Sequence, residues 1–427
     1  MGNEAGAGFF GRHLKLDLSP LRESSDLRSL FAGGGISFAG SMLTYVALPY
    51  QAYELSHSSL VVGLLSLAEL VPLLVTAFVG GALADSVDRR RMVRLTEAGM
   101  CLVSAVLVLN ARIAHPHLWV LFAVSVVLTG LDGLQRPSLD AMVPMLVRPD
   151  QLAATSSIMS LRSQLGMIAA PALTGVIIAA GGLTLTYTLD VASFLVSLVF
   201  LLRLGAMPPP GESDLSLRAV RIGLAYAWRR KDLLGTYLVD INAMFFGIPN
   251  ALFPQIASHF GGASALGVLY ASPALGAFLI TATSGWVSHV RRYGRMISLA
   301  AALWGAGIVL LGFAASLWMA ALGLVIAGGG DMISGLGRST VWNQSIPNEL
   351  RGRLAGIEML SYSSGPTLGN VEAGILERLV GLRSSIVAGG ALCIAGTVIL
   401  SLVLPAFWNY DAREGEKYRT APGEQAG

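Results

Sequence analysis

The sequence predicts an all-α membrane protein with twelve transmembrane helices in two pseudo-symmetric six-helix halves. Three observations predict it: an apolar composition, twelve long apolar runs and an internal repeat. Of the 427 residues, 54% are hydrophobic and only 13% are charged, whereas soluble proteins carry about 25% charged residues. This composition excludes an ordinary soluble enzyme, a disordered protein and a nucleic-acid-binding protein.

The apolar runs have the length of membrane-crossing helices, which need about 20 mostly apolar residues. They cover residues 28–53, 60–84, 92–112, 118–141, 152–180, 184–204, 232–258, 264–288, 295–315, 318–343, 353–378 and 383–407. Each run is continuous and about twice as long as the alternating segments of a membrane β-barrel. We therefore expect helices and no strands.

The placement of basic residues predicts that both termini lie in the cytoplasm. An even number of spans puts the two termini on the same side of the membrane. If that side is the cytoplasm, only Arg112, Arg378 and Arg383 of the 29 Lys and Arg residues lie outside. This is the asymmetry that the positive-inside rule requires. Residues 1–26 are polar and show no signal-peptide pattern.

One long polar stretch divides the runs six and six. It spans Gly205–Lys231, has three consecutive prolines after Met207 and ends in a basic cluster. We expect an N-terminal tail (1–27), a first half (28–204), a cytoplasmic linker (205–231), a second half (232–407) and a C-terminal tail (408–427).

The two halves repeat each other at an offset of about 200 residues. The loop Gly81–Arg91 after the second run corresponds to Gly285–Arg295 after the eighth. Gly130–Asp132 corresponds to Gly329–Asp331, and Ala170–Gly175 to Gly365–Gly369. Two such halves suit a transporter that binds its ligand near the midplane and rocks one half against the other.

Carboxylates inside the runs are candidates for proton coupling in a central cavity, because a charge at a helix centre is costly. The candidates are Asp331, Asp240, Asp132, Glu69 and Asp190. For Asp132 the alternative is an ion pair with Arg136, one helical turn away. Arg338 follows Asp331 by seven residues, about 10 Å along the axis, so we expect no direct pair between them. Asp240 has no basic residue within a turn. Glu69 and Asp190 have the alternative of facing a helix end or a neighbouring hydroxyl group.

The loop between the second and third runs resembles the signature of the major facilitator superfamily. Gly81, Leu83, Asp85, Arg89 and Arg90 match it, while Asp88 replaces its usual glycine. The strings at 48–56, 68–72 and 347–353 are similar to the branch that contains the enterobactin exporter and macrolide-efflux type pumps. The resemblance covers residues 28–405. It implies a twelve-helix fold, a plasma (inner) membrane location and, commonly, proton-driven export.

The resemblance also implies a cytoplasmic gate that latches in the outward-open state. Asp85 would meet the start of the eleventh run, and the arginines would lie in the anionic headgroup layer. The predicted gate residues are Gly81, Asp85, Arg89, Arg90, Arg136, Glu358, Arg351 and Arg353. The alternative is that these arginines only fix the topology.

The Pro–Gly segments of the fifth and eleventh runs resemble the antiporter motif of the same superfamily. Proline removes a backbone donor and bends a helix, while glycine allows close packing. We interpret them as a hinge, with ordinary helix bending as the alternative. The hinge residues are Pro171, Gly175, Gly365, Pro366 and Gly369.

The first functional hypothesis is a proton-coupled exporter of amphipathic small molecules such as drugs or antibiotics. The second is a dedicated exporter of a siderophore or another secondary metabolite, and the third is a non-transporting receptor or a lipid flippase. No nucleotide-binding loop, metal-ligand cluster or nucleophile–base arrangement is present, so we expect no enzyme, cofactor or metal. The expected partners are the substrate, protons and the lipid bilayer, and we expect a monomer.

Overall fold

The computed structural model describes residues 17–205, 228, 230–346 and 348–411, without the side chains of 77–86, 288 and 348–363. In this part of the chain the secondary structure is helical, without strands. The first half contains α2 (Ser19–Glu23), α3 (Ser25–Ser56), α4 (Ser59–Ser86), α5 (Arg89–Arg112), α6 (Leu118–Met142) and α7 (Leu152–Leu201). Short 3-10 turns, η1 (Val143–Met145) and η2 (Pro149–Gln151), join α6 to α7.

The second half follows the linker. Its helices are α9 (Lys231–Phe246), α10 (Phe253–His259), α11 (Ala263–Ala282), α12 (Tyr293–Gly312), α13 (Leu317–Ser345), α14 (Asn348–Val380), α15 (Leu382–Val403) and α16 (Pro405–Trp408). The turns η3 (Asn250–Leu252) and η4 (Ser284–His289) precede α10 and follow α11.

Local sequence sets several helix ends. The Ser24 side chain caps α3 by accepting a hydrogen bond from the Leu27 amide at 3.1 Å. The Asp88 carboxylate caps α5 by accepting from the amides of Arg90 and Arg91, the role that a short acidic side chain favours at a helix start. Within α7 the chain reverses at Gly182, whose φ of 71° lies in a region that glycine adopts without steric cost. This reversal falls at the predicted break between the fifth and sixth runs.

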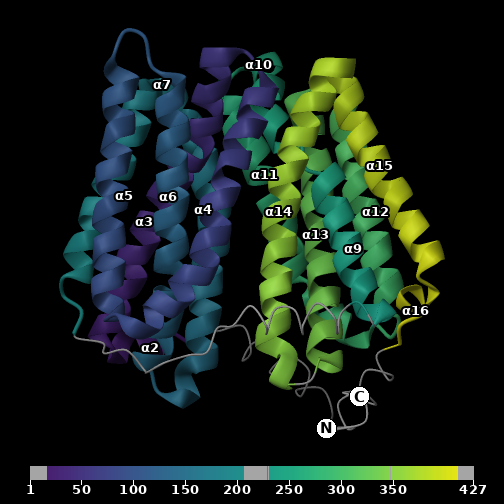
Figure 1. Cartoon of the computed structure of the whole chain (residues 1–427), viewed down its shortest axis with the longest axis horizontal. Coiled ribbons are helices and arrows are strands. Elements are labelled where there is room, and N and C mark those ends of the chain that lie inside the picture. The colour runs from purple at the N-terminus through teal and green to yellow at the C-terminus, as the bar shows by residue number, and fades with distance from the viewer. Residues whose placement is uncertain (1–16, 206–227, 229, 347, 412–427) are drawn as a thin grey trace, which may run out of the picture.

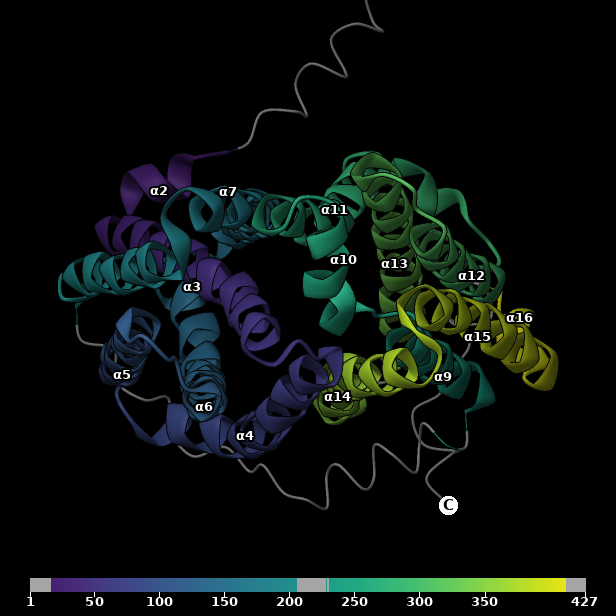
Figure 2. The same cartoon turned by 90° about the horizontal axis from the view of Figure 1, so that it is seen from above.

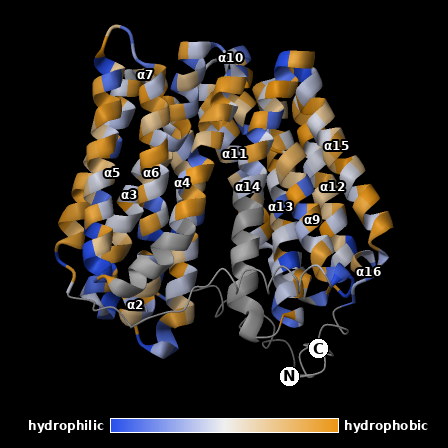
Figure 3. Cartoon of the chain, viewed as in Figure 1, coloured by the Kyte–Doolittle hydropathy of each residue, from blue (hydrophilic) through white to orange (hydrophobic). Residues whose placement is uncertain are grey.

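The helices are long and apolar enough for a bilayer. Among the described residues, nine helices meet this criterion, and one of them, Pro149–Leu201, contains two predicted spans. Figure 3 shows hydrophobic stretches running along α4, α5 and α15. The predicted seventh span is divided, since α9 ends at Phe246 and α10 begins at Phe253. The number of twelve crossings therefore stays a prediction.

Two helical bundles lie side by side, α2–α7 in one and α9–α16 in the other (Figures 1 and 2). They join mainly where α7 packs against α11 and α4 against α14, contacts that Figure 2 shows at opposite sides of the molecule. In one contact α4, an early helix of the first half, meets α14, a late helix of the second half. In the other contact α11, an early helix of the second half, meets α7, the last helix of the first half. In Figure 1 the ribbons of the two halves approach each other near α10 and diverge toward α2 and α16.

Candidate functional site

A shared arginine links two of the predicted acidic residues. The Arg338 guanidinium on α13 forms an ion pair with Asp240 on α9, and its Nη2 lies 3.8 Å from Asp331 Oδ1. The expectation that Arg338 is too far from Asp331 was wrong, because the long arginine side chain spans two turns of its own helix. Asp240 and Arg338 are 6% and 12% exposed, whereas Asp331 is 42% exposed. Asp331 is thus the member of this cluster that water reaches most easily.

A second acidic residue lies where the two halves meet. Tyr45 of α3 and Tyr270 of α11 make an edge-to-face contact across the two halves, with ring centroids 5.5 Å apart. Phe253 of α10 packs against Tyr270 in the same way, at 5.0 Å. Glu69 of α4 lies close enough to both tyrosines to interact with them electrostatically. Tyr45 is 49% exposed, so these aromatic rings and Glu69 border the space between the halves.

Asp190 lies inside the first half and is 1% exposed. Its Oδ2 accepts hydrogen bonds from Thr44 Oγ1 at 2.6 Å and from Ser104 Oγ at 2.9 Å. These hydrogen bonds join α7 to α3 and α5. They agree with the alternative given for Asp190 in the sequence analysis, in which its carboxylate faces a neighbouring hydroxyl group.

Asp132 forms the ion pair that the sequence offered as its alternative role. Arg136 Nη2 lies 3.9 Å from Asp132 Oδ2, and both side chains are more than half exposed. The pair belongs to a single helix and is accessible, so it places no buried charge between the two halves.

Among the carboxylates that sequence reasoning missed, Glu97 and Glu372 lie well inside the apolar runs. Glu97 of α5 is 3% exposed and accepts a hydrogen bond at 2.7 Å from Gln135 of α6. Glu372 of α14 lines an apolar pocket. Both residues lie five or six positions inside a predicted run, so a list of every carboxylate within the predicted runs would have included them.

The predicted gate residues are only partly described. Arg89 is 8% exposed, and its Nη1 donates to the Ala141 carbonyl oxygen at the end of α6. Arg90 Nη1 donates to the Leu204 carbonyl oxygen at 3.0 Å. These bonds fasten the start of α5 to the ends of α6 and α7 in the same half. A latch between the halves would need the side chains of Asp85, Arg351, Arg353 and Glu358. These side chains lie outside the described part of the chain, as do those around Gly81.

The predicted hinge segments make close helix crossings. A Cβ atom added at Gly175 would lie 2.5 Å from the Ala263 carbonyl oxygen and 2.9 Å from Gly267 Cα, both in the other half. The helix α7 continues through Pro171, whose carbonyl oxygen lies in the same contact.

In α14, the matching segment packs within its own half. A Cβ atom at Gly365 would lie 2.8 Å from Met244 Cβ, and one at Gly369 would lie 2.5 Å from the Phe245 carbonyl oxygen. The helix continues through Pro366. Whether either segment bends during function stays a prediction.

Polar bonds join the halves at the end where α10 lies, and the sequence analysis did not predict them. Gln255 of α10 accepts from Ser59 of α4 at 2.6 Å and donates to Glu377 of α14 at 3.0 Å. Asn370 of α14 donates to Ser66 of α4 at 3.1 Å. We call Ser59, Gln255, Glu377, Asn370 and Ser66 the polar clasp. Together with the crossing at Gly175, the polar clasp holds this end of the molecule closed.

The fold and these contacts define a transporter-like molecule: two helical halves that meet at one end, with charged groups buried inside them. The chain matches the family described as transmembrane secretion effector over residues 16–423, and it belongs to this family of the major facilitator superfamily. It is therefore a multi-pass membrane transporter and not an enzyme.

Two curated relatives support this assignment. The chain is 29% identical, over 399 residues, to the "Enterobactin exporter EntS" of Shigella boydii serotype 4 (strain Sb227), covering 91% of this chain and 94% of the relative. The same values apply to the protein of that name from Escherichia coli O81 (strain ED1a).

Solved structures share the fold. A POT family transporter in complex with 5-aminolevulinic acid aligns with a TM-score of 0.71 at 14% identity, over 90% of this chain and 97% of that one. A bacterial homolog of the human lysosomal transporter Spinster aligns with a TM-score of 0.67 at 16% identity, over 93% and 98%.

Proposed function

We propose that this protein is a proton-coupled exporter of amphipathic small molecules in the plasma membrane, working by alternating access as a monomer. The observation that carries the proposal is the sharing of Arg338 between Asp240 and Asp331. A cation held between two carboxylates responds to the protonation of either one, because the proton removes one of the two attractions.

The exposure of the two carboxylates indicates which one exchanges the proton. Asp331 is the accessible member and Asp240 the buried one. When Asp331 takes up a proton, Arg338 is left to pair with Asp240 alone, and the contact between Arg338 and Asp331 within α13 is released. Loss of the proton restores the three-group cluster. This exchange ties the charge state of the site to the position of α13 relative to α9.

The basic linker supports a cytoplasmic position for both termini. In that orientation the polar clasp and the Gly175 crossing close the outer side, and the halves diverge on the cytoplasmic side (Figure 1). We assign the predicted gate at Gly81–Arg91 and the start of α14 to the opposite state, in which the cytoplasmic side closes. Residues 205–231 connect the halves while they move.

The proposed substrate surface is the group of Tyr45, Tyr270 and Glu69 between the halves. Aromatic faces supply apolar area and a polar edge, and the carboxylate favours a cationic or hydrogen-bonding group. An amphipathic molecule with a flat apolar part fits this combination.

A second candidate is a dedicated exporter of a siderophore or another secondary metabolite. The observation that favours it is the likeness to the enterobactin exporters over nearly the whole chain. The tyrosine hydroxyl groups would then donate hydrogen bonds to a catechol-like substrate, and the Glu69 carboxylate would accept hydrogen bonds from it.

The test uses the purified protein in liposomes with an imposed proton gradient. Two substrates are compared, a lipophilic amine dye and a catecholate siderophore, and proton counterflow is recorded in the same vesicles. We expect uphill substrate movement that a protonophore abolishes and that Asp331→Asn abolishes as well. The control is Asp150→Asn, which alters an exposed carboxylate paired with Arg148.

The outcome distinguishes the candidates. Movement of the dye favours the general exporter, and movement of the siderophore alone favours the dedicated one. Uphill movement that survives both the protonophore and Asp331→Asn contradicts proton coupling. Absence of flux for both substrates would contradict both candidates.

A further inference from the structure

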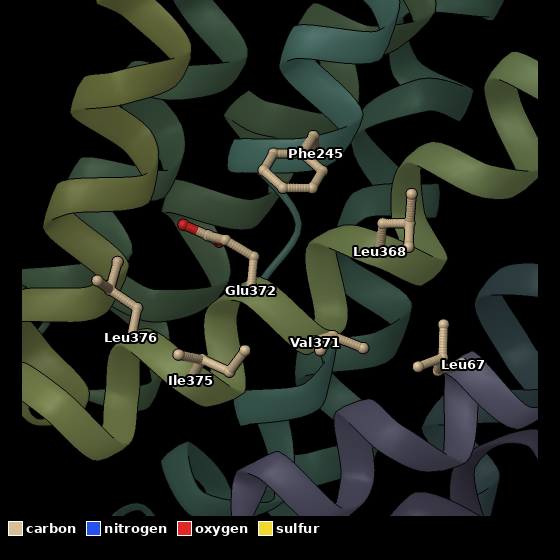
Figure 4. A pocket seen from close by; sticks show the side chains of 7 residues that line it. All are labelled: Leu67, Phe245, Leu368, Val371, Glu372, Ile375 and Leu376. Carbon is tan, nitrogen blue, oxygen red and sulfur yellow. The ribbon is translucent and has the colours of Figure 1, made fainter.

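An acidic residue lines an otherwise apolar pocket on the outside of the helical bundle. The pocket has a volume of about 370 Å³, and its walls are Leu67, Phe245, Leu368, Val371, Glu372, Ile375 and Leu376. Figure 4 shows the Glu372 side chain extending beside the ring of Phe245. Six of the seven lining side chains are apolar, so the carboxylate is the polar group that an occupant would meet.

The pocket lies on an exposed face of α14, and we infer that this face contacts lipid. Leu368 and Ile375 lie one turn before and one turn after Glu372 on α14, and they are 41% and 46% exposed. Residues at these spacings share one face of a helix. The exposed face of a membrane helix contacts lipid, so the pocket opens sideways toward the acyl chains.

The Glu372 carboxylate is unpaired among the described residues. Within the described part of the chain it makes no hydrogen bond and no ion pair, while nearby Glu377 accepts from Gln255. Glu372 precedes the end of α14 at Val380 by eight residues, about 12 Å along the axis, so its side chain is too short to reach the headgroups. A carboxylate at this depth needs either a proton or a cation that arrives with its own apolar surface.

We propose that this pocket binds a lipophilic monovalent cation that enters from the lipid. Its volume lies within the range of small-molecule pockets, about 300–1,000 Å³. The apolar walls accept the hydrophobic surface of such a cation, Glu372 compensates its charge, and the Phe245 ring adds a cation–π contact. A neutral or anionic molecule would leave the carboxylate uncompensated.

The walls of the pocket come from both halves. Leu67 belongs to α4, and the remaining residues belong to α9 and α14. Rocking of the halves therefore changes the pocket, and the occupant binds most tightly while the outer contact between α4 and α14 is closed. This site is separate from Asp331 and from the Tyr45–Tyr270 contact, so binding of the cation does not require proton coupling at those residues. Its change with the rocking of the halves rests on the proposed function.

The experiment measures equilibrium binding of tetraphenylphosphonium to the full-length protein in lipid nanodiscs. Tetraphenylborate, which has the same shape and the opposite charge, is the control probe. We expect Glu372→Gln to weaken tetraphenylphosphonium binding at least tenfold and Glu372→Asp to weaken it less. Leu376→Trp keeps the charge and fills the pocket, and it should weaken binding as well.

Asp331→Asn separates this site from the proton-coupling proposal. This variant should bind tetraphenylphosphonium as the wild type does, even where it no longer transports. The inference is overturned if the wild type does not bind the cation, if tetraphenylborate binds equally well, or if Glu372→Gln and Leu376→Trp both bind the cation unchanged.

Discussion

Replacing Gly175 with alanine should open the end of the molecule at which α10 lies. The substitution adds one methyl group to α7 where it crosses α11 of the other half. That methyl carbon would lie 2.5 Å from the Ala263 carbonyl oxygen and 2.9 Å from Gly267 Cα. Both neighbours are backbone atoms and cannot rotate away, so the two helices must separate.

The size of the effect follows from the overlap. Carbon atoms in favourable contact are about 3.5–4.0 Å apart, so the crossing must widen by about 1 Å or the closed state must carry the strain. Overpacking of this kind costs about 1–3 kcal/mol. Since 1.4 kcal/mol is tenfold in an equilibrium constant, the closed state should lose about fivefold to 150-fold relative to the open one. The gain in helix propensity from alanine is present in both states and cancels.

Pulsed electron paramagnetic resonance can measure this shift. Spin labels at Leu185→Cys in α7 and Ser258→Cys in α10 report the separation of the halves, because both positions are exposed. The native Cys101 and Cys393 are buried and free. Gly175→Ala should move the population toward longer distances in lipid nanodiscs.

The matched control is Gly130→Ala, where the added Cβ atom would lie 3.7 Å from Pro72 Cβ, an ordinary contact within one half. Gly267→Ala, whose Cβ atom would lie 2.7 Å from the Pro171 carbonyl oxygen, should act like Gly175→Ala. The reasoning fails if both crossing variants give the same distance distribution as the wild type and the control.

Three further predictions concern buried polar groups. Arg338→Met should destabilise the protein by about 3–5 kcal/mol, because it leaves the 6% exposed Asp240 without its cation; adding Asp240→Asn should recover part of this loss in detergent unfolding, and no recovery would count against the pair. Asp190→Leu removes the acceptor of Thr44 and Ser104 and should cost about 1–3 kcal/mol for each hydroxyl left unsatisfied, whereas Asp190→Asn should cost clearly less in the same assay; equal losses would refute this. Ser59→Ala together with Gln255→Leu removes bonds of the polar clasp worth about 0.5–1.5 kcal/mol each, and should lengthen the spin-label distances less than Gly175→Ala does.

The buried charges show where sequence reasoning was sufficient. The pair of Asp132 and Arg136 was predictable because the residues are one helical turn apart on a single helix. The partner of Asp240 was not, since Arg338 lies 98 positions later in the chain and meets it only after α9 and α13 pack. The distance from Arg338 to Asp331 was misjudged because the axial separation was considered without the reach of the arginine side chain.

The closed end of the molecule also depended on packing. Gly175 was identified from its motif, but its contact with Ala263 and Gly267 requires α7 and α11 to cross. The bonds of Gln255 to Ser59 and Glu377 join three helices. A polar residue at a helix end has no periodic signal that distinguishes a bond between halves from contact with water.

The sequence alone determined that this chain is a helical membrane protein in two similar halves, because the length of an apolar run and the spacing of basic residues are local properties of the chain. It also determined the family, through short motifs whose order is preserved. Only the tertiary structure decided which charges are paired, which carboxylate lines an apolar pocket and which end of the molecule is closed. Those properties depend on contacts between residues far apart in sequence, and such contacts exist only once the helices have packed.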